Sequence, residues 1–437
     1  MPRSPKPTDT GKTPVVLVLT VPPAERELED EREAEMRSLL DTAGRRVVAI
    51  VTQHLPKPVG ATYIGTGKVE EVGAAIAEHE AQEVVFDVQL SPRQLRNLET
   101  ELKLGVIDYN DLILAIFARN ARTAQAMLAV ELAQLQYARS RLRRLWTHLD
   151  RQALGGSGGA SGAGAAGAVR GPGEKQIELD KRQVRDRIIE LQDKLNEIES
   201  RKDRAVAGRS EAFNIALVGY TNAGKSTLMN ALTKAGVLAE DRLFATLDTR
   251  TARLRIDGCP NVVLSDTVGF IRNLPPTLIA SFHATLAEVR EADLLLHVID
   301  ASSPMMDEQI EAVDGVLKAI DAGDIPTLMV FNKVDQVYSK TILLAYRRRC
   351  RNSVMVAALT GLGLDDLRSA IRGHIASLMR QVQVRFPATN GALNAFLRSR
   401  ATITDERYED DQALLTFDAD ERLISELRTH PDLVITG

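Results

Sequence analysis

The first part of the chain alternates short apolar runs with amphipathic stretches. Three apolar runs predict buried strands, at residues 15–20, 47–52 and 83–88. Three stretches with helical spacing predict helices, at residues 26–42, 68–79 and 91–102. Such alternation is typical of parallel strands connected by helices. We therefore expect a small parallel α/β domain over residues 15–119, preceded by a disordered tail at 1–14.

A longer helical region follows, with apolar residues at three- and four-residue spacing. Two stripes are formed by Leu135, Ala138, Leu142, Leu145 and Leu149, and by Val184, Ile188, Leu191, Leu195 and Ile198. Between them, residues 155–173 carry nine glycines, a composition that does not support a helix. The pattern predicts an antiparallel helical hairpin over 120–209 with 155–173 as its tip loop. Composition alone leaves open whether this loop is functional or a flexible linker.

The pattern changes again near residue 212, where strand, loop and helix begin to repeat. Apolar strands are predicted at 213–218, 262–266, 294–300, 328–332 and 354–356. This repetition indicates a doubly wound parallel sheet in a domain over 210–380. The remaining residues, 381–437, predict strand, helix, two strands, helix and strand, which we interpret as a small separate α+β domain.

The strongest chemical signal is a glycine-rich turn that follows the first of these strands and opens a helix. It consists of Gly219, Tyr220, Thr221, Asn222, Ala223, Gly224, Lys225, Ser226 and Thr227. The glycines let backbone N–H groups curl around phosphate oxygens, and the helix N-terminus adds partial positive charge. Lys225 can reach the β- and γ-phosphates, and Ser226 offers a hydroxyl to Mg²⁺. The turn therefore predicts a P-loop that binds a nucleoside triphosphate.

The next apolar strand also ends in a polar motif, formed by Asp266, Thr267, Val268 and Gly269. A carboxylate at this strand end can hold a Mg²⁺-bound water. The Gly269 N–H can contact the γ-phosphate. Such a short motif is a weak signal alone, but its position about 40 residues after a P-loop makes it specific.

A further strand ends at Asn332, Lys333, Val334 and Asp335. A carboxylate at 335 can accept two hydrogen bonds from the ring N–H and the exocyclic amine of guanine. Adenine lacks that paired donor edge, so its binding would leave Asp335 unsatisfied. Asn332 can tie this turn to the P-loop, and the stem of Lys333 can lie along the base. The motif predicts that the nucleotide is GTP.

Two weaker elements complete the predicted site. The first comprises Phe244, Ala245, Thr246, Leu247 and Asp248, where Thr246 can place its hydroxyl on Mg²⁺ while the γ-phosphate is present. Thr249 and Thr251 are alternatives for that role. The second comprises Ala357, Ala358 and Leu359, whose backbone amides can contact the guanine O6.

Composition and charge narrow the class of protein. A chain of 437 residues suggests about three domains, and a net charge of -4 means that a nucleic-acid partner would need a local basic surface. Cys259 and Cys350 cannot form a disulfide framework, which fits a reducing compartment. Apolar runs stay shorter than the roughly 18–20 residues of a membrane span, and the start does not read as a secretory signal. We expect a cytoplasmic protein.

The order and wording of these motifs resemble the HflX family of translational GTPases, within the Obg–HflX group. The resemblance extends over nearly the whole chain. The segments whose sequences resemble the family's are residues 63–71, 90–98, 121–123, 130–136, 170–174 and 244–248. It implies binding to the large ribosomal subunit, with splitting or rescue of stalled ribosomes under stress. It also implies that the hairpin approaches ribosomal RNA near the peptidyl-transferase region. We expect the protein to act as a monomer.

The hairpin carries arginines that suit this role around the only tryptophan, Trp146; they are Arg139, Arg141, Arg143, Arg144 and Arg151. Clustered arginines bind RNA phosphates and stack on unpaired bases. On residues alone, an alternative stays open, in which a regulatory GTP switch docks a protein partner through this hairpin. A third reading, an ATP-driven RNA remodeler, is disfavoured by Asp335.

Some positions depart from the family pattern or add to it. The tip loop is longer and richer in glycine and alanine, Asp248 is followed by Thr-Arg-Thr, and Ala357 replaces the usual serine. Phe270 follows Gly269, where a glutamine could orient the attacking water, so we expect slow intrinsic hydrolysis that a partner accelerates. Asn222 resembles the asparagine that ligates K⁺ in related GTPases, which suggests a K⁺ requirement.

Overall fold

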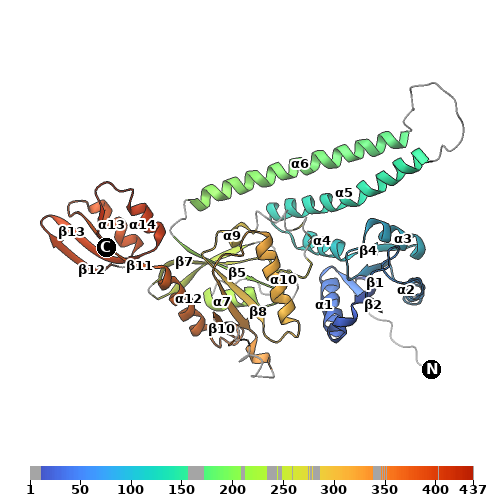
Figure 1. Cartoon of the computed structure of the whole chain (residues 1–437), viewed down its shortest axis with the longest axis horizontal. Helices are drawn as coiled ribbons and strands as arrows, with labels where there is room; N and C mark the ends of the chain where they lie inside the picture. Colours follow the sequence, from blue (N-terminus) through green and yellow to red (C-terminus); the bar gives the residue numbers. More distant parts are fainter. Residues whose placement is uncertain are drawn as a thin grey trace.

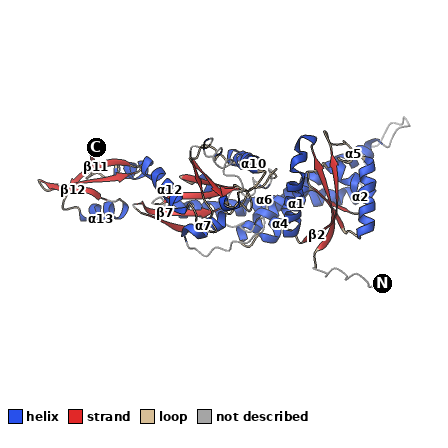
Figure 2. Cartoon of the chain, turned by 90° about the horizontal axis from the view of Figure 1, so that it is seen from below, coloured by secondary structure: helices blue, strands red, loops and turns tan. Residues whose placement is uncertain are grey.

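The computed structural model describes residues 11–155, 172–207, 212–233, 249–257, 259–273, 286–337, 352–401 and 403–436, with residues 244, 275, 278, 346, 348 and 350. In the hairpin, it describes side chains at 124–139, 182–198 and 200. Three sheets follow one another along the long axis of the molecule, and two long helices run beside them (Figures 1 and 2).

The N-terminal unit is a four-stranded parallel sheet in the order β2-β1-β3-β4. Its strands are β1 (Thr13–Val21), β2 (Arg45–His54), β3 (Glu83–Phe86) and β4 (Gly105–Ile107). Its helices are η1 (Pro23–Leu28), α1 (Glu29–Thr42), α2 (Thr66–His79), α3 (Pro92–Leu102) and α4 (Tyr109–Asn120). The three predicted strands and the parallel arrangement are confirmed. β4 and α4 were not predicted, and β1 begins at Thr13, so the predicted tail at 1–14 is too long; residues 1–10 lie outside the described part.

The central strand β1 is buried on both faces, which explains its unbroken apolar run. Val15, Leu17 and Leu19 pack against α1 and α4, whereas Val16 and Val18 pack against α2 and α3. Because successive side chains of a strand point to opposite faces, one strand supplies both layers of core.

The hairpin consists of α5 (Ala124–Gly155) and α6 (Pro172–Ala207), which lie side by side in Figure 1. Arg187 on α6 donates from Nε and Nη2 to the two carboxylate oxygens of Glu131 on α5, at 2.8 and 3.0 Å. Ile188, Leu191 and Leu195 are buried, as their spacing predicted. The predicted tip loop is too wide, since α5 includes residue 155 and α6 includes residues 172 and 173. The rest of the loop, 156–171, lies outside the described residues.

The central unit is a six-stranded sheet in the order β10-β9-β8-β5-β7-β6. Its strands are β5 (Phe213–Gly219), β6 (Arg250–Ile256), β7 (Cys259–Asp266), β8 (Leu294–Asp300), β9 (Thr327–Asn332) and β10 (Ser353–Met355). One face carries α7 (Lys225–Thr233) and α12 (Leu364–Leu378), and the other carries α9 (Ala287–Arg290) and α10 (Met306–Ala319).

One strand of the central sheet differs from the sequence prediction. β6 is antiparallel to β7, so the sheet is mixed rather than wholly parallel. Leu254 and Ile256 face the core, whereas the alternate positions Arg253 and Arg255 are exposed. An edge strand with charged alternate residues lacks the continuous apolar run that revealed the other strands.

The C-terminal unit is an antiparallel sheet in the order β12-β13-β11-β14, with its own apolar core. Its elements are β11 (Arg380–Pro387), α13 (Gly391–Arg400), β12 (Ile403–Glu409), β13 (Gln412–Ala419), α14 (Glu421–Leu427) and β14 (Val434–Ile435). This order of elements confirms the α+β prediction, although β11 begins one residue before the predicted boundary.

The N-terminal unit, the base of the hairpin and the central unit share one apolar core. Phe117 of α4, Leu132 of α5 and Leu191 of α6 belong to the same cluster of buried residues as Phe270 of the central unit. The N-terminal unit therefore packs directly against the part of the central unit that carries the predicted phosphate site. Among the described residues, no helix has the length and apolar character needed to cross a bilayer.

Candidate nucleotide-binding site

The predicted P-loop connects the end of β5 to the start of α7. Two glycines are required there by geometry. Gly219 has a φ of +149°, and a Cβ at this position would lie 2.2 Å from the carbonyl oxygen of Val298. Gly224 has a φ of +93°, and its Cβ would lie 2.3 Å from Nδ2 of Asn332. Other residues would be strained in this backbone conformation and would clash, so the tight turn depends on glycine.

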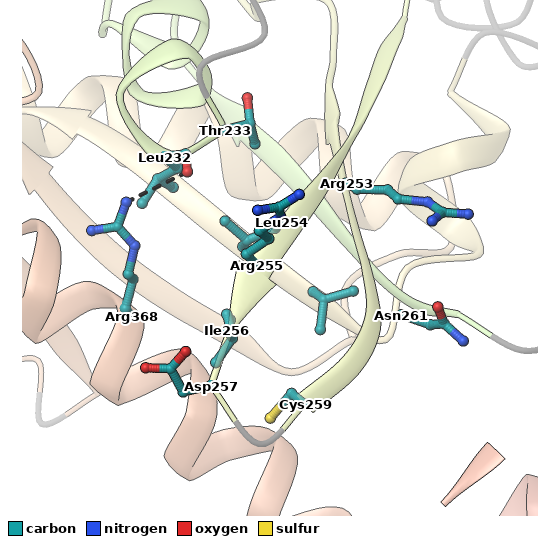
Figure 3. A pocket seen from close by; sticks show the side chains of 11 residues that line it. Leu232, Thr233, Arg253, Leu254, Arg255, Ile256, Asp257, Cys259, Asn261 and Arg368 are labelled. Atoms are coloured by element: carbon teal, nitrogen blue, oxygen red, sulfur yellow. Dashed lines mark hydrogen bonds between the residues drawn. The ribbon is translucent and has the colours of Figure 1, made fainter. Parts of the chain in front are cut away.

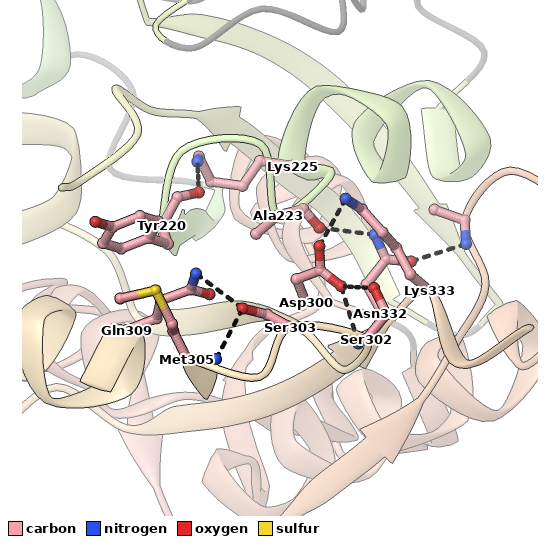
Figure 4. A network of polar contacts seen from close by, with 11 residues as sticks. Tyr220, Ala223, Lys225, Asp300, Ser302, Ser303, Met305, Gln309, Asn332 and Lys333 are labelled. Carbon is pink, nitrogen blue, oxygen red and sulfur yellow. Dashed lines mark hydrogen bonds and ion pairs between the residues drawn. The ribbon is translucent and has the colours of Figure 1, made fainter. Parts of the chain in front are cut away.

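Lys225 opens α7, and its side chain turns back over the loop (Figure 4). Its Nζ donates to the carbonyl oxygens of Gly219, at 3.1 Å, and Tyr220, at 2.8 Å. Burial lowers the pKa of Lys225 to about 8, although Asp266 acts in the opposite direction. A buried ammonium group held by carbonyl dipoles is a strong attractor for phosphate oxygens.

Ser226 and Asp266 lie next to each other at the edge of the sheet. Ser226 Oγ donates to Asp266 Oδ2 at 2.5 Å, and the Asp266 side chain is fully buried. Thr267 anchors this strand end, because its hydroxyl donates to the carbonyl oxygen of Leu217 at 2.6 Å. A hydroxyl beside a carboxylate supplies the oxygen ligands that Mg²⁺ prefers. The residues present therefore fit a magnesium ion.

The backbone after Val268 lies directly on the P-loop. The Thr221 N–H donates to the carbonyl oxygen of Phe270 at 2.8 Å, and the Phe270 N–H donates to the carbonyl oxygen of Gly219 at 3.1 Å. These two bonds bring Gly269 beside Lys225. The two segments that were predicted to contact the γ-phosphate are thus adjacent.

The predicted base-reading turn is tied to the P-loop through Asn332 (Figure 4). Asn332 Nδ2 donates to the carbonyl oxygen of Ala223 at 2.8 Å, and Asn332 Oδ1 accepts from the N–H of Ala358 at 3.0 Å. Lys333 Nζ lies 2.7 Å from Asp300 Oδ2. Asp335 is exposed on the short helix η2 (Val334–Gln336). The side chain of Asn332 therefore joins three of the predicted motifs.

Comparison with known proteins agrees with this arrangement. Three family models match: "GTP-binding GTPase N-terminal" over residues 30–118, "GTP-binding GTPase Middle Region" over 120–209 and "50S ribosome-binding GTPase" over 214–333. The GTPase HflX of Magnetococcus marinus is 44% identical over 86% of this chain and 85% of its own length. The GTPase HflX of Escherichia coli is 42% identical over 89% of this chain and 88% of its own length.

The chain belongs to the HflX family of GTPases. It is accordingly a P-loop protein that binds guanine nucleotides and hydrolyses GTP. Among solved structures, a GTP-binding protein from Sulfolobus solfataricus in complex with GDP is 24% identical, with a TM-score of 0.42, over 82% of this chain and 97% of that chain.

The structure brings most of the predicted HflX nucleotide site together, but it leaves one element undescribed. The P-loop, the Asp266–Gly269 segment, the turn after Asn332 and the loop at Ala357–Leu359 meet at one edge of the central sheet. Phe244 is buried, and its ring centroid lies 4.7 Å from that of Phe117. Ala245, Thr246, Leu247 and Asp248 lie outside the described residues. The roles assigned to individual side chains remain predictions.

One residue beside the base-reading turn was missed by sequence analysis. Asp300 ends β8, accepts from the Ser302 N–H and hydroxyl at 3.0 and 2.6 Å, and pairs with Lys333. A polar residue that ends an apolar strand was the signal that identified Asp266 and Asn332, and the same signal applied to Asp300.

The central unit has a hollow that is separate from the nucleotide motifs. It has a volume of about 720 Å³ and lies between α7, the β6–β7 edge and α12 (Figure 3). Arg253, Arg255 and Arg368 are among its lining residues, together with Cys259. None of its lining residues belongs to the P-loop, the Asp266 motif or the base-reading turn.

Proposed function

We propose that this HflX-family GTPase binds the large ribosomal subunit, where it splits or rescues stalled ribosomes under stress. The observation that carries the proposal is the match of residues 214–333 to a family model described as a 50S ribosome-binding GTPase. The long hairpin beside the sheets supports it, since a paired helix extension can reach into a crevice of a larger particle (Figure 1). We further propose that the protein acts as a cytoplasmic monomer.

The proposed chemistry follows from the positions of the motifs. Lys225 and the Gly269 N–H stabilise charge on the γ-phosphate, and Asp335 recognises guanine, with the amides at 357–359 near its O6. Ser226 and Thr246 would hold Mg²⁺, assisted by Asp266. The ion would supply neutralisation of the phosphate charge. Phosphoryl transfer needs positioning and charge stabilisation more than covalent catalysis, so these groups are sufficient for slow turnover.

We propose that the ribosome accelerates hydrolysis. Phe270 has no polar group with which to orient the attacking water, and it is buried at 2% exposure. A partner must therefore order the water or the switch segments. Single-turnover GTP hydrolysis should be much faster with large subunits than without them. Equal rates would contradict this part of the proposal.

A potassium ion is a further proposed cofactor. Asn222 has a φ of 61° and lies exposed on the P-loop, where it can face a nucleotide. Replacing K⁺ by Na⁺ should slow turnover. Unchanged turnover in Na⁺ would contradict the K⁺ requirement.

The ribosome proposal is tested by charge reversal in the hairpin. Arg141, Arg143 and Arg144 lie on α5, and their side chains are outside the described set. Changing all three to glutamate should abolish co-sedimentation with large subunits in the presence of a non-hydrolysable GTP analogue.

The matched control reverses three exposed arginines of the N-terminal unit, Arg46, Arg93 and Arg96, and should retain binding. Equal loss in both triple variants would show a non-specific charge effect. Full binding by the hairpin variant would instead favour the alternative, a regulatory GTP switch that docks a protein partner through the hairpin. Sucrose-gradient profiles with GTP would then distinguish subunit splitting from binding alone.

A further inference from the structure

A single carboxylate of the N-terminal unit contacts two segments of the nucleotide site. Glu35 lies on α1, and its side chain is 13% exposed. Its Oε1 accepts a hydrogen bond from the Tyr220 hydroxyl at 2.5 Å. Its Oε2 accepts from Arg272 Nη2 at 2.9 Å and from Arg272 Nε at 3.2 Å. Tyr220 belongs to the P-loop and Arg272 follows the Asp266–Gly269 segment, so Glu35 joins these two segments.

The three side chains form a closed ring of hydrogen bonds. Besides binding Glu35, the Tyr220 hydroxyl accepts from the backbone N–H of Arg272 at 3.0 Å. Tyr109 of α4 adds a second contact from the N-terminal unit, because its hydroxyl donates to the carbonyl oxygen of Arg272 at 3.2 Å. The position of Arg272 is therefore fixed through both its side chain and its backbone.

Two members of the ring, Tyr220 and Arg272, belong to the segments that carry the predicted phosphate ligands. The carbonyl oxygen of Tyr220 accepts from Lys225 Nζ at 2.8 Å. Arg272 follows Gly269 by three residues, and the intervening Phe270 is hydrogen-bonded to the P-loop. A Cβ on Gly269 would lie 3.0 Å from Lys225 Nζ and 2.8 Å from Thr221 Cγ2. Gly269 and Lys225 therefore lie close together in the structure in which this ring is formed.

Burial makes these contacts sensitive to the loss of any one partner. Tyr220 is 5% exposed, and the Arg272 side chain is 17% exposed. Burial and the nearby Glu35 charge raise the pKa of Tyr220, so its hydroxyl remains a donor. Burial opposes the charge of Arg272, but Glu35 and the two tyrosines raise its pKa overall. Removing the carboxylate would leave a buried guanidinium without its charged acceptor.

We propose that Glu35 is a positioning residue for GTP, which holds Gly269 next to Lys225 so that one γ-phosphate can contact both. This inference rests on the proposed γ-phosphate roles of those two residues. GDP lacks the γ-phosphate, so its binding does not depend on the placement of Gly269. The effect of Glu35 therefore falls on GTP affinity and hydrolysis and not on GDP affinity.

The experiment compares Glu35→Gln with the unaltered full-length protein. The expected result is about tenfold weaker binding of a non-hydrolysable GTP analogue, with GDP affinity within about twofold, since coupling between two sites commonly changes affinity 5–150-fold. Single-turnover hydrolysis should also slow by about tenfold. Retained GDP binding shows that the variant is folded. Tyr220→Phe, which removes only the hydroxyl, should show a smaller change in the same direction.

Two further variants make the comparison specific. Arg272→Gln should reproduce the Glu35→Gln effect, and the double variant should be little worse than either single variant, because both changes break the same ring. Glu33→Gln is the matched control on the same helix. Its ion pair is with Arg37 of α1, at 2.7 Å, so both affinities should stay unchanged.

Three outcomes would overturn the proposal. Unchanged affinity for both the GTP analogue and GDP would mean that Glu35 only holds the two units together. An equal loss for both nucleotides would mean that it supports the P-loop alone. Tighter binding of the GTP analogue would mean that the ring restrains Gly269 away from the γ-phosphate. By contrast, failure of the unaltered protein to bind either nucleotide would contradict the nucleotide-site assignment itself, and the proposal with it.

Discussion

The properties of Lys225 depend on the groups around a single ammonium. Its side chain is 6% exposed and donates to two backbone carbonyl oxygens of the P-loop. Burial disfavours the charged form and lowers its pKa to about 8. A bound phosphate would favour the charged form and raise the pKa again. Nucleotide binding and protonation of Lys225 are therefore linked.

This linkage predicts a pH dependence of GDP binding. Below pH 8 Lys225 is largely protonated before binding, and affinity should change little between pH 7 and 7.5. Above pH 8 a proton must be taken up, so affinity should be about fourfold weaker at pH 8.5 than at pH 7. Calorimetry in two buffers of different ionisation enthalpy would measure both the affinity and the proton uptake. Stronger binding at pH 8.5, or proton release, would contradict the prediction.

At the scale of the elements, the nucleotide site depends on hydrogen bonds that connect its loops to one another. Asn332 ends β9, and its amide group joins the P-loop at Ala223 to the loop at Ala358. The side chain is 2% exposed, so both hydrogen bonds are shielded from water. A buried donor or acceptor that loses its partner costs about 1–3 kcal/mol. This one side chain therefore fixes the positions of three loops relative to one another.

We predict that Asn332→Ala weakens GDP binding by at least about tenfold and lowers the free energy of unfolding by about 2–4 kcal/mol. The Ala358 N–H and the Ala223 carbonyl oxygen would both lose a partner. Urea unfolding without nucleotide and fluorescence titration with GDP would measure the two effects. The control is Asn352→Ala, because Asn352 also donates to a strand carbonyl oxygen, of Thr327 at 2.7 Å, but is exposed. GDP affinity that falls equally in both variants would refute the link.

Elements with an uninterrupted apolar run could be predicted from the sequence, and others could not. β8 was predicted with the bounds that it has, 294–300, because every residue up to Asp300 is buried in the sheet. β4 has only three residues, and β6 carries exposed arginines, so neither has an apolar run long enough to predict a strand. The phosphate motifs were found because their chemistry requires contiguous residues. The Glu35 contact could not be found, since 237 residues separate it from Arg272.

At the scale of the whole molecule, a half-buried carboxylate near the contact between the N-terminal and central units makes stability depend on pH. Asp87, just after β3, accepts from the Thr20 N–H at 3.0 Å and from the Thr20 hydroxyl at 2.8 Å. Burial raises its pKa to about 6, against partial compensation by Thr20, Arg32 and Arg272. A carboxyl whose pKa is higher in the folded state than in the unfolded state favours the fold at low pH. That contribution is lost as the pH rises from about 4 to 6.

We predict that Asp87→Asn stabilises the protein at neutral pH, by about 2 kcal/mol. Asparagine retains an oxygen that can accept both bonds from Thr20, and it carries no charge to bury. The difference between the variant and the unaltered protein should shrink towards pH 4. Thermal unfolding between pH 4 and 7.5 would measure it, with Asp41→Asn as control, since the Asp41 side chain is 63% exposed. A variant that is destabilised at pH 7.5 would contradict the prediction.

Selective binding of guanine nucleotides requires that the phosphate cradle and the Asp335 carboxylate converge on one pocket. Calorimetric titration of the unaltered protein and of Asp335→Asn with GDP, xanthosine diphosphate and ADP, in Mg²⁺ buffer, tests this directly. The unaltered protein should prefer GDP over ADP by roughly 10⁴-fold, because adenine lacks the paired donors that the Asp335 carboxylate accepts from guanine. Asp335→Asn should lose GDP and gain xanthosine diphosphate, whose ring presents an acceptor in place of the amine. Equal affinity of the unaltered protein for GDP and ADP, or an Asp335→Asn variant that still prefers GDP, would contradict the account.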